Sequence, residues 1–274
     1  MNNTVRVGGF NILPTVVKHL LIINGIFFLA KVLLMPRGID MDEIFGLHYV
    51  GAPAFRPWQI ITYMFMHGDF GHIFFNMFAL WMFGSTLENY WGSKKFLIYY
   101  LVTGIGAAII HYLIIYFQIQ PTLALLNQFI DNPSLESYRY LVEHNPTERM
   151  QGMLSQNLLV LQQSPESLNE LVRVTAGLKS QYLNSFNIIG ASGSVFGLLL
   201  AFGMMFPNSE IYLYFLLPIK AKWFVIIYGA IELIYGIFGS ADGVAHFAHL
   251  GGMIFGFILI MIWRHQAKKQ RGYF

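Results

Sequence analysis

Residues 246–263 read HFAHLGGMIFGFILIMIW, an apolar run with two histidines near its start and small residues along its length. A helix that crosses about 30 Å of hydrocarbon needs about 20 predominantly apolar residues. Five further stretches have the same character, namely 15–35, 60–88, 95–117, 190–206 and 221–239. The sequence therefore predicts an all-α polytopic membrane protein, a bundle of six transmembrane helices.

The composition supports this prediction. Apolar residues make up 55% of the chain and charged residues only 11%, whereas a soluble domain carries about 25% charged residues. The net charge is only +3 and the basic residues are scattered, so we expect no nucleic-acid binding. The chain has no cysteine, which excludes disulfides, thiolate catalysis and cysteine-based metal sites. Lys31 interrupts the first apolar stretch and no clear cleavage site follows it, so we expect a retained span rather than a signal peptide.

The loops predict an orientation. With six spans, both termini lie on one side, and that side also holds most of the loop lysines and arginines: Lys94, Lys95, Lys220, Lys222, Arg264, Lys268, Lys269 and Arg271. Cytoplasmic loops carry an excess of Lys and Arg. We therefore expect both termini in the cytoplasm.

Residues 118–186 differ from the other loops in length and polarity. They divide the chain into a core with helices 1–3 (1–117), an extracytoplasmic insert of about three amphipathic helices (118–186), and a core with helices 4–6 and a basic tail (187–274). Within the insert an apolar stripe recurs at helical spacing, formed by Met150, Met153, Leu154, Leu158 and Leu161. Two interpretations are open: the stripe packs against the other insert helices, or it contacts the membrane or a substrate.

Three polar clusters interrupt the apolar stretches: His67-Gly-Asp-Phe-Gly-His72-Ile-Phe-Phe-Asn76, Gly190-Ala-Ser192-Gly193, and Ala245-His246-Phe-Ala-His249-Leu-Gly-Gly252. Ionisable groups inside a membrane are costly and usually face a cavity or another helix. Spans two, four and six run in the same direction, and the clusters lie near the start of each, so we expect them at similar depth near the outer face. Small residues allow these helices to approach one another; they are Gly190, Gly193, Gly197, Gly252 and Gly256.

These residue types suit acyl transfer. A serine hydroxyl is a weak nucleophile until a base takes its proton, and Ser192 and His249 would form such a pair. The tetrahedral intermediate needs hydrogen-bond donors aimed at its oxyanion. His72 and Asn76 lie one helical turn apart and face the same side, so they can supply these donors together with the backbone N–H of Ser192.

The three clusters resemble the rhomboid family of intramembrane proteases over the whole six-helix core. The family pattern is His-x-x-x-Asn in the second helix, Gly-x-Ser-Gly opening the fourth, and a histidine followed by glycine at +3 and +7 in the sixth. The last spacing fits His249 and not His246. The resemblance implies that Ser192 is the nucleophile and His249 the base of a dyad without a third acid. It implies cleavage of membrane-protein substrates near the outer membrane face, without metal, cofactor or nucleotide.

The resemblance also assigns supporting residues. Phe196 matches an aromatic position that packs against the base, and Glu88 matches a structural acid near the inner end of span two. Ser194 stands where the family more often has a small apolar residue, so it is a second candidate nucleophile. For Glu232 in span five we identify no partner and expect a structural hydrogen bond. We expect the chain in a bilayer, that of a bacterial inner (plasma) membrane, with the active site near the extracytoplasmic face.

Other functions fit the sequence less well. Rhomboid-like proteins that act without catalysis, in membrane quality control or as scaffolds, typically lack the serine or the histidine, and both are present. A metal transporter or metalloprotease would use the histidines at 67, 72, 246 and 249, but no His-Glu-x-x-His occurs, and we expect His67 and His246 to hold loops or helix ends. A hydrolase nucleophile elbow needs Gly-x-Ser-x-Gly after a strand, and residue 194 is serine.

Overall fold

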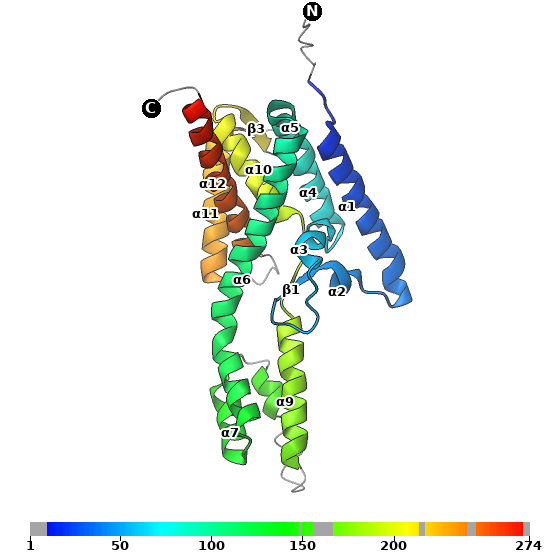
Figure 1. Ribbon diagram of the computed structural model, residues 1–274, viewed down its shortest axis with the longest axis vertical. Helices are drawn as coiled ribbons and strands as arrows, with labels where there is room; N and C mark the ends of the chain where they lie inside the picture. The colour runs from blue at the N-terminus through cyan, green and yellow to red at the C-terminus, as the bar shows by residue number, and fades with distance from the viewer. Residues whose placement is uncertain (1–9, 148–149, 156–166, 214–216, 240–244, 271–274) are drawn as a thin grey trace, which may run out of the picture. The chain divides into compact units, whose positions relative to one another are not determined.

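The computed structural model describes residues 10–147, 150–155, 167–213, 217–239 and 245–270 (Figure 1). The chain divides into two compact units, one made of residues 1–47, 57–111 and 188–274, and the other of residues 48–56 and 112–187. The first unit contains all three polar clusters. The division falls within one long helix, α6 (Ser93–Asp131).

The first unit is a helical bundle. It begins with α1 (Thr15–Leu34), the 3₁₀ turn η1 (Met35–Arg37) and α2 (Met41–Phe45), and continues through α3 (Gln59–Thr62) and η2 (Tyr63–Phe65). A continuous helical stretch follows, made of α4 (Phe70–Ala79), a π-helical segment η3 (Leu80–Gly84) and α5 (Ser85–Trp91), and then the first part of α6. The unit ends with α10 (Ser192–Met205), α11 (Ala221–Phe238) and α12 (His246–Gln270). Two short strands of this unit, β3 (Glu210–Leu213) and β4 (Leu217–Lys220), pair antiparallel. Two more, β1 (Leu47–His48) and β2 (Asn187–Ile188), lie where the chain passes from one unit to the other.

Five helical stretches in the described residues are long and apolar enough to cross a membrane: Thr15–Arg37, Phe70–Trp91, Ser93–Asp131, Ala221–Phe238 and His246–Gln270. The sixth expected span, α10, has only 14 residues and is about 21 Å long at 1.5 Å per residue. It is apolar and mostly buried, because α11 and α12 pack beside it (Figure 1). The prediction of an all-α polytopic fold is confirmed.

Glycines bring α10 and α12 into close contact. A Cβ atom at Gly252 would collide with the backbone carbonyl of Gly193, and one at Gly256 would collide with the hydroxyl of Tyr99 on α6. A Cβ at Gly197 would lie 2.7 Å from Cβ of Thr103, also on α6. The glycine pattern therefore serves close helix packing at the place where the polar residues of α10 and α12 meet.

The second unit has its own apolar core. It contains the end of α6, α7 (Leu135–His144), a helical segment at 150–155 and α9 (Ser167–Asn184). The buried side chains of this core are Leu126, Phe129, Tyr138, Leu141, Met150, Leu154, Leu171 and Leu178. Met150 and Leu154 of the predicted stripe thus pack against the other insert helices, while Leu158 and Leu161 lie outside the described residues.

The third helix differs from its prediction. The sequence predicts a span over 95–117 followed by a polar insert, but α6 continues to Asp131 with Pro121 inside the helix. The reason lies in its later apolar residues. Ile119, Leu126 and Phe129 are fully buried, and in proteins such tertiary packing contributes more to helix stability than intrinsic propensity.

Candidate active site

Ser192 is the first residue of α10 and follows a tight turn. Gly190 has φ +127°, a conformation that favours glycine, and its N–H donates to the carbonyl of Tyr63 at 2.9 Å. A Cβ atom at Gly190 would lie 2.9 Å from both Cε1 and Nε2 of His72. The turn therefore places the start of α10 directly beside the His72 ring, and the first N–H groups of a helix carry a partial positive charge.

His249 lies in the first turn of α12 and faces Ser192. Its Nε2 is 2.9 Å from Oγ of Ser192, across 57 residues of sequence. Phe196, one turn after Ser192, stacks on the imidazole with ring centroids 4.1 Å apart and an interplanar angle of 6°. The ring is buried, and Phe196 packs against one of its faces. This packing orients Nε2 of His249 toward the hydroxyl of Ser192.

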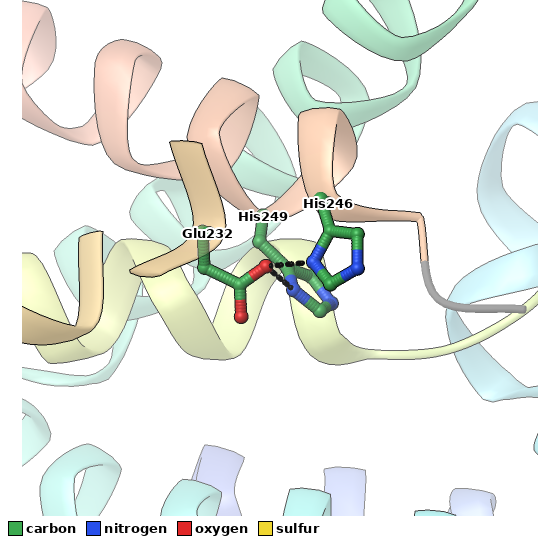
Figure 2. Close-up of side chains that lie close together, drawn as sticks. All are labelled: Glu232, His246 and His249. Carbon is green, nitrogen blue, oxygen red and sulfur yellow. Dashed lines mark hydrogen bonds and ion pairs between the residues drawn. The ribbon is translucent and has the colours of Figure 1, made fainter. Parts of the chain in front are cut away.

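The other nitrogen of His249 meets an acid that sequence reasoning left without a partner (Figure 2). Oε2 of Glu232, on α11, is 2.9 Å from Nδ1 of His249 and 2.6 Å from Nδ1 of His246. All three residues are buried. An acid in the middle of an apolar span was the available signal, but its partner depends on how α11 is rotated against α12, which the sequence does not state.

His72 and Asn76 lie on α4, with His72 in its first turn. Asp69 caps this helix by accepting from the backbone N–H of His72 at 2.9 Å, and Nδ1 of His72 accepts from the N–H of Gly68 at 3.2 Å. In a neutral ring the remaining nitrogen, Nε2, then carries the proton. Asn76 is 6% exposed, and among the described residues its Nδ2 has no hydrogen-bond partner. Nε2–H of His72 and Nδ2–H of Asn76 are thus two donors for which no acceptor is found among the described residues.

Ser194, the second candidate nucleophile, faces the opposite way. It is fully buried, and its hydroxyl donates to the carbonyl of Tyr100 on α6 at 2.8 Å. Glu88, on α5, accepts from the N–H groups of Val16 and Val17 at 2.9 and 2.8 Å. It therefore caps the start of α1 and lies outside the site.

Two further histidines border the site. His246, at the start of α12, shares the carboxylate of Glu232. His67 precedes α4 and packs edge-on against His72 with ring centroids 5.0 Å apart. Burial, and secondarily the neighbouring His72, lowers the pKa of His67 to about 3, so at neutral pH this ring is uncharged.

Glu232, His246 and His249 are also spaced as ligands of a metal ion would be, with their ligand atoms within 4.8 Å of one another. Both histidines, however, direct Nδ1 at the same carboxylate oxygen at hydrogen-bond distance. A carboxylate only accepts hydrogen bonds. Two N–H donors on one oxygen account for the cluster without a cation.

Comparisons with known proteins identify relatives of this chain. Over 264 residues the chain is 24% identical to an uncharacterized mitochondrial rhomboid protein of Schizosaccharomyces pombe, covering 90% of this chain and 64% of that protein. It is 38% identical over 52 residues to the rhomboid protease GluP of Bacillus subtilis, covering 19% of this chain and 10% of GluP. It is 31% identical over 100 residues to the chloroplastic Rhomboid-like protein 11 of Arabidopsis thaliana, covering 34% of each chain.

The chain thus spans less than two thirds of the length of each of these relatives. The family model for the rhomboid domain matches residues 54–119 and 152–266, which is more than half of the chain. Both matched segments contain polar clusters of the site, His72 and Asn76 in the first and Ser192 and His249 in the second. The chain is a multi-pass membrane protein of the rhomboid family.

Proposed function

We propose that this protein is an intramembrane serine endopeptidase that cleaves transmembrane segments of other membrane proteins. The observation that carries the proposal is the 2.9 Å contact between Oγ of Ser192 and Nε2 of His249. A nucleophile and base within hydrogen-bond reach are the signature of an activated serine. Membership of a family with relatives named as proteases supports the same activity.

In the first chemical step, Oγ of Ser192 attacks the substrate carbonyl carbon while its proton passes to Nε2 of His249. The carbonyl π electrons move to oxygen and form an oxyanion. The backbone N–H of Ser192, Nε2–H of His72 and Nδ2–H of Asn76 donate to that oxyanion. Such donors act in a site prepared before the reaction, so they need no reorganisation when charge develops.

In the second step, the C–N bond breaks and Nε2 of His249 gives its proton to the leaving amine. Water then attacks the acyl-enzyme, losing a proton to Nε2, and the ester bond to Ser192 breaks as Oγ recovers that proton. The cycle consumes one water and needs no metal or cofactor. Ser194 takes no part, because its hydroxyl is buried and bonded to the carbonyl of Tyr100.

The bilayer determines what reaches this site. Apolar side chains cover much of the outside of the helices, among them Ile226, Ile234 and Phe257, as expected for lipid-facing surfaces. We place both termini in the cytoplasm and the site near the extracytoplasmic face, since the loop lysines and arginines gather on the side of the termini. Substrates then enter from the membrane and are cut near their outer end.

The test is cleavage in reconstituted liposomes. Purified protein and a single-span model substrate are combined, and products are identified by mass spectrometry for the wild type, Ser192→Ala and His249→Ala. We expect one cut within or beside the span by the wild type and none by either variant. Cleavage that survives in folded Ser192→Ala would overturn the proposal. Folded wild type that cuts no substrate would favour a catalytically inactive rhomboid-like protein.

A further inference from the structure

The buried carboxylate of Glu232 is held against Nδ1 of His249 (Figure 2). The other nitrogen of that ring, Nε2, contacts Ser192. Ser192 Oγ, His249 and Glu232 form a chain of contacts at 2.9 and 2.9 Å. We propose that Glu232 is the third member of a Ser–His–Glu triad, a positioning residue that sets the proton on His249. This inference rests on the proposed serine protease function and adds an acid to the dyad that the sequence pattern implies.

Glu232 determines the tautomer of His249. An ionised carboxylate has no hydrogen to donate, so the Nδ1 that faces it at 2.9 Å must carry the proton. In the neutral imidazole Nε2 then holds a lone pair. That is the nitrogen facing Oγ of Ser192, and only this tautomer can take the serine proton. Without the acid, the ring could hold its proton on either nitrogen.

Glu232 also stabilises the positive charge that His249 gains during the reaction. When His249 takes the serine proton it becomes an imidazolium among buried side chains, which is costly in an apolar site. The carboxylate of Glu232 at Nδ1 offsets that charge as it forms. The rings of His72 on α4, His111 on α6 and His246 on α12 interact electrostatically with His249 or share its acid. Glu232, on α11, is thus the anionic member of this group.

The carboxylate of Glu232 is itself fixed by a second hydrogen bond, from His246. A buried carboxylate is stable only when it is paired and hydrogen-bonded. His246 supplies a second N–H at 2.6 Å to the same oxygen, and the N-terminal end of α12 adds a favourable partial charge. His246 therefore fixes the oxygen that orients His249. A metal ion bound at Nδ1 would instead leave the proton of the neutral ring on Nε2, where it would block the base.

The experiment compares Glu232→Gln with Glu88→Gln, a matched replacement of another buried acid in the same unit. Cleavage rates of the liposome substrate are measured from pH 5 to pH 9, together with thermal unfolding. The amide of Glu232→Gln can donate to Nδ1 and select the wrong tautomer. We expect kcat to fall about 10²- to 10⁴-fold, KM to stay within about twofold, and the acidic limb of the pH–rate profile to move to lower pH.

Two further measurements, on Glu232→Asp and with a chelator, complete the test. Glu232→Asp should recover part of the lost kcat, whereas Glu88→Gln should lower the unfolding temperature and leave the pH–rate profile in place. A chelator should leave wild-type activity unchanged. Loss of activity on chelation, restored by Zn²⁺, would replace the triad with a metal site.

The outcomes separate this inference from the function on which it rests. If Ser192→Ala and His249→Ala abolish cleavage while folded Glu232→Gln keeps the wild-type kcat and pH–rate profile, the triad is wrong and the dyad stands. If Glu232→Gln and Glu88→Gln lose activity only in proportion to lost folding, Glu232 is a structural link between α11 and α12. If Ser192→Ala keeps its activity, the proposed function itself fails.

Discussion

The region around Glu88 and the region around Glu232 each bury a carboxylate among apolar helices, but the groups that surround the two acids differ. Glu88 accepts from two backbone N–H groups of α1 and from the hydroxyl of Ser93 at 2.6 Å. Glu232 accepts from two imidazoles, one of which contacts Ser192. The first set of partners is fixed by the fold, whereas the second can exchange protons. The hydrogen-bond partners of a buried acid thus indicate whether it stabilises a helix or takes part in the reaction.

The same contrast extends to the buried donors. Near Glu88 the N–H groups of Val16 and Val17 and the hydroxyl of Ser93 meet the Glu88 carboxylate. Near Ser192 the Nδ2 of Asn76 is buried and, in the described part of the chain, has no acceptor. A buried unsatisfied donor lowers stability by about 1–3 kcal/mol. We infer that its acceptor is the substrate oxyanion, so the site gives up stability in exchange for transition-state binding.

Among substitutions outside Ser192, His249 and Glu232, the largest expected effect comes from Asn76→Ala. The substitution removes a buried donor that has no described partner in the fold, so the free energy of unfolding should not fall and should rise by up to about 3 kcal/mol. Loss of one oxyanion donor should lower kcat about 10²- to 10³-fold. Cleavage kinetics and thermal unfolding on the same preparation check both parts. A wild-type kcat would remove Asn76 from the oxyanion site.

Glu88→Ala should show the opposite pattern. Two backbone N–H groups of α1 and the Ser93 hydroxyl lose their acceptor, which should lower the free energy of unfolding by about 3 kcal/mol. The kcat per folded molecule should not change, because Glu88 has no contact with the Ser192–His249 pair. Activity is normalised to the folded fraction measured by thermal unfolding. A fall in normalised kcat that matches Glu232→Gln would erase the distinction between the two acids.

Protonation of the buried His67 ring should lower the free energy of unfolding at acidic pH. Burial, the main cause, lowers its pKa to about 3 in the folded state, against an ordinary value of 6.5 for histidine. The neutral ring therefore supports folding above pH 6.5, and this stability is lost as pH falls toward 3. Between pH 7 and pH 5 the loss should be about 2 kcal/mol. Thermal unfolding of wild type and His67→Gln across this range checks it, and an equal pH dependence of the two would contradict the assignment.

The smallest effect is expected for Ser194→Ala. Its hydroxyl donates to the carbonyl of Tyr100 at 2.8 Å and lies 3.6 Å from Sδ of Met64, and a typical hydrogen bond to a carbonyl contributes about 1 kcal/mol. The unfolding temperature should fall slightly while kcat stays at the wild-type value. A large loss of kcat without loss of folding would reopen the choice between the two serines.

Much of the fold could be predicted from the sequence, because hydropathy and spacing act locally. The apolar stretches mark the membrane helices, and the positions of Ser192 and His249 at the starts of spans four and six indicate that they share a depth. The glycines of α10 and α12 indicate a close helix contact. These inferences need only the order of the spans and their direction.

Other features depend on tertiary contacts that no local pattern states. Glu232 lies 17 residues before His249 on a neighbouring helix, so their contact depends on the rotation of α11. The extension of α6 beyond residue 117 depends on the burial of Ile119, Leu126 and Phe129. The short length of α10 follows from its burial within the bundle, where it does not need to match the full hydrocarbon thickness.

The central claim, that Ser192 is a nucleophile activated by His249, is tested most directly by a fluorophosphonate probe, which reacts with activated serines. Detergent-solubilised wild type, Ser192→Ala, Ser194→Ala and His249→Ala are labelled side by side, with thermal unfolding to establish that each is folded. We expect labelling of the wild type and Ser194→Ala and none of Ser192→Ala or His249→Ala. Labelling of folded Ser192→Ala, or none of folded wild type, would contradict it.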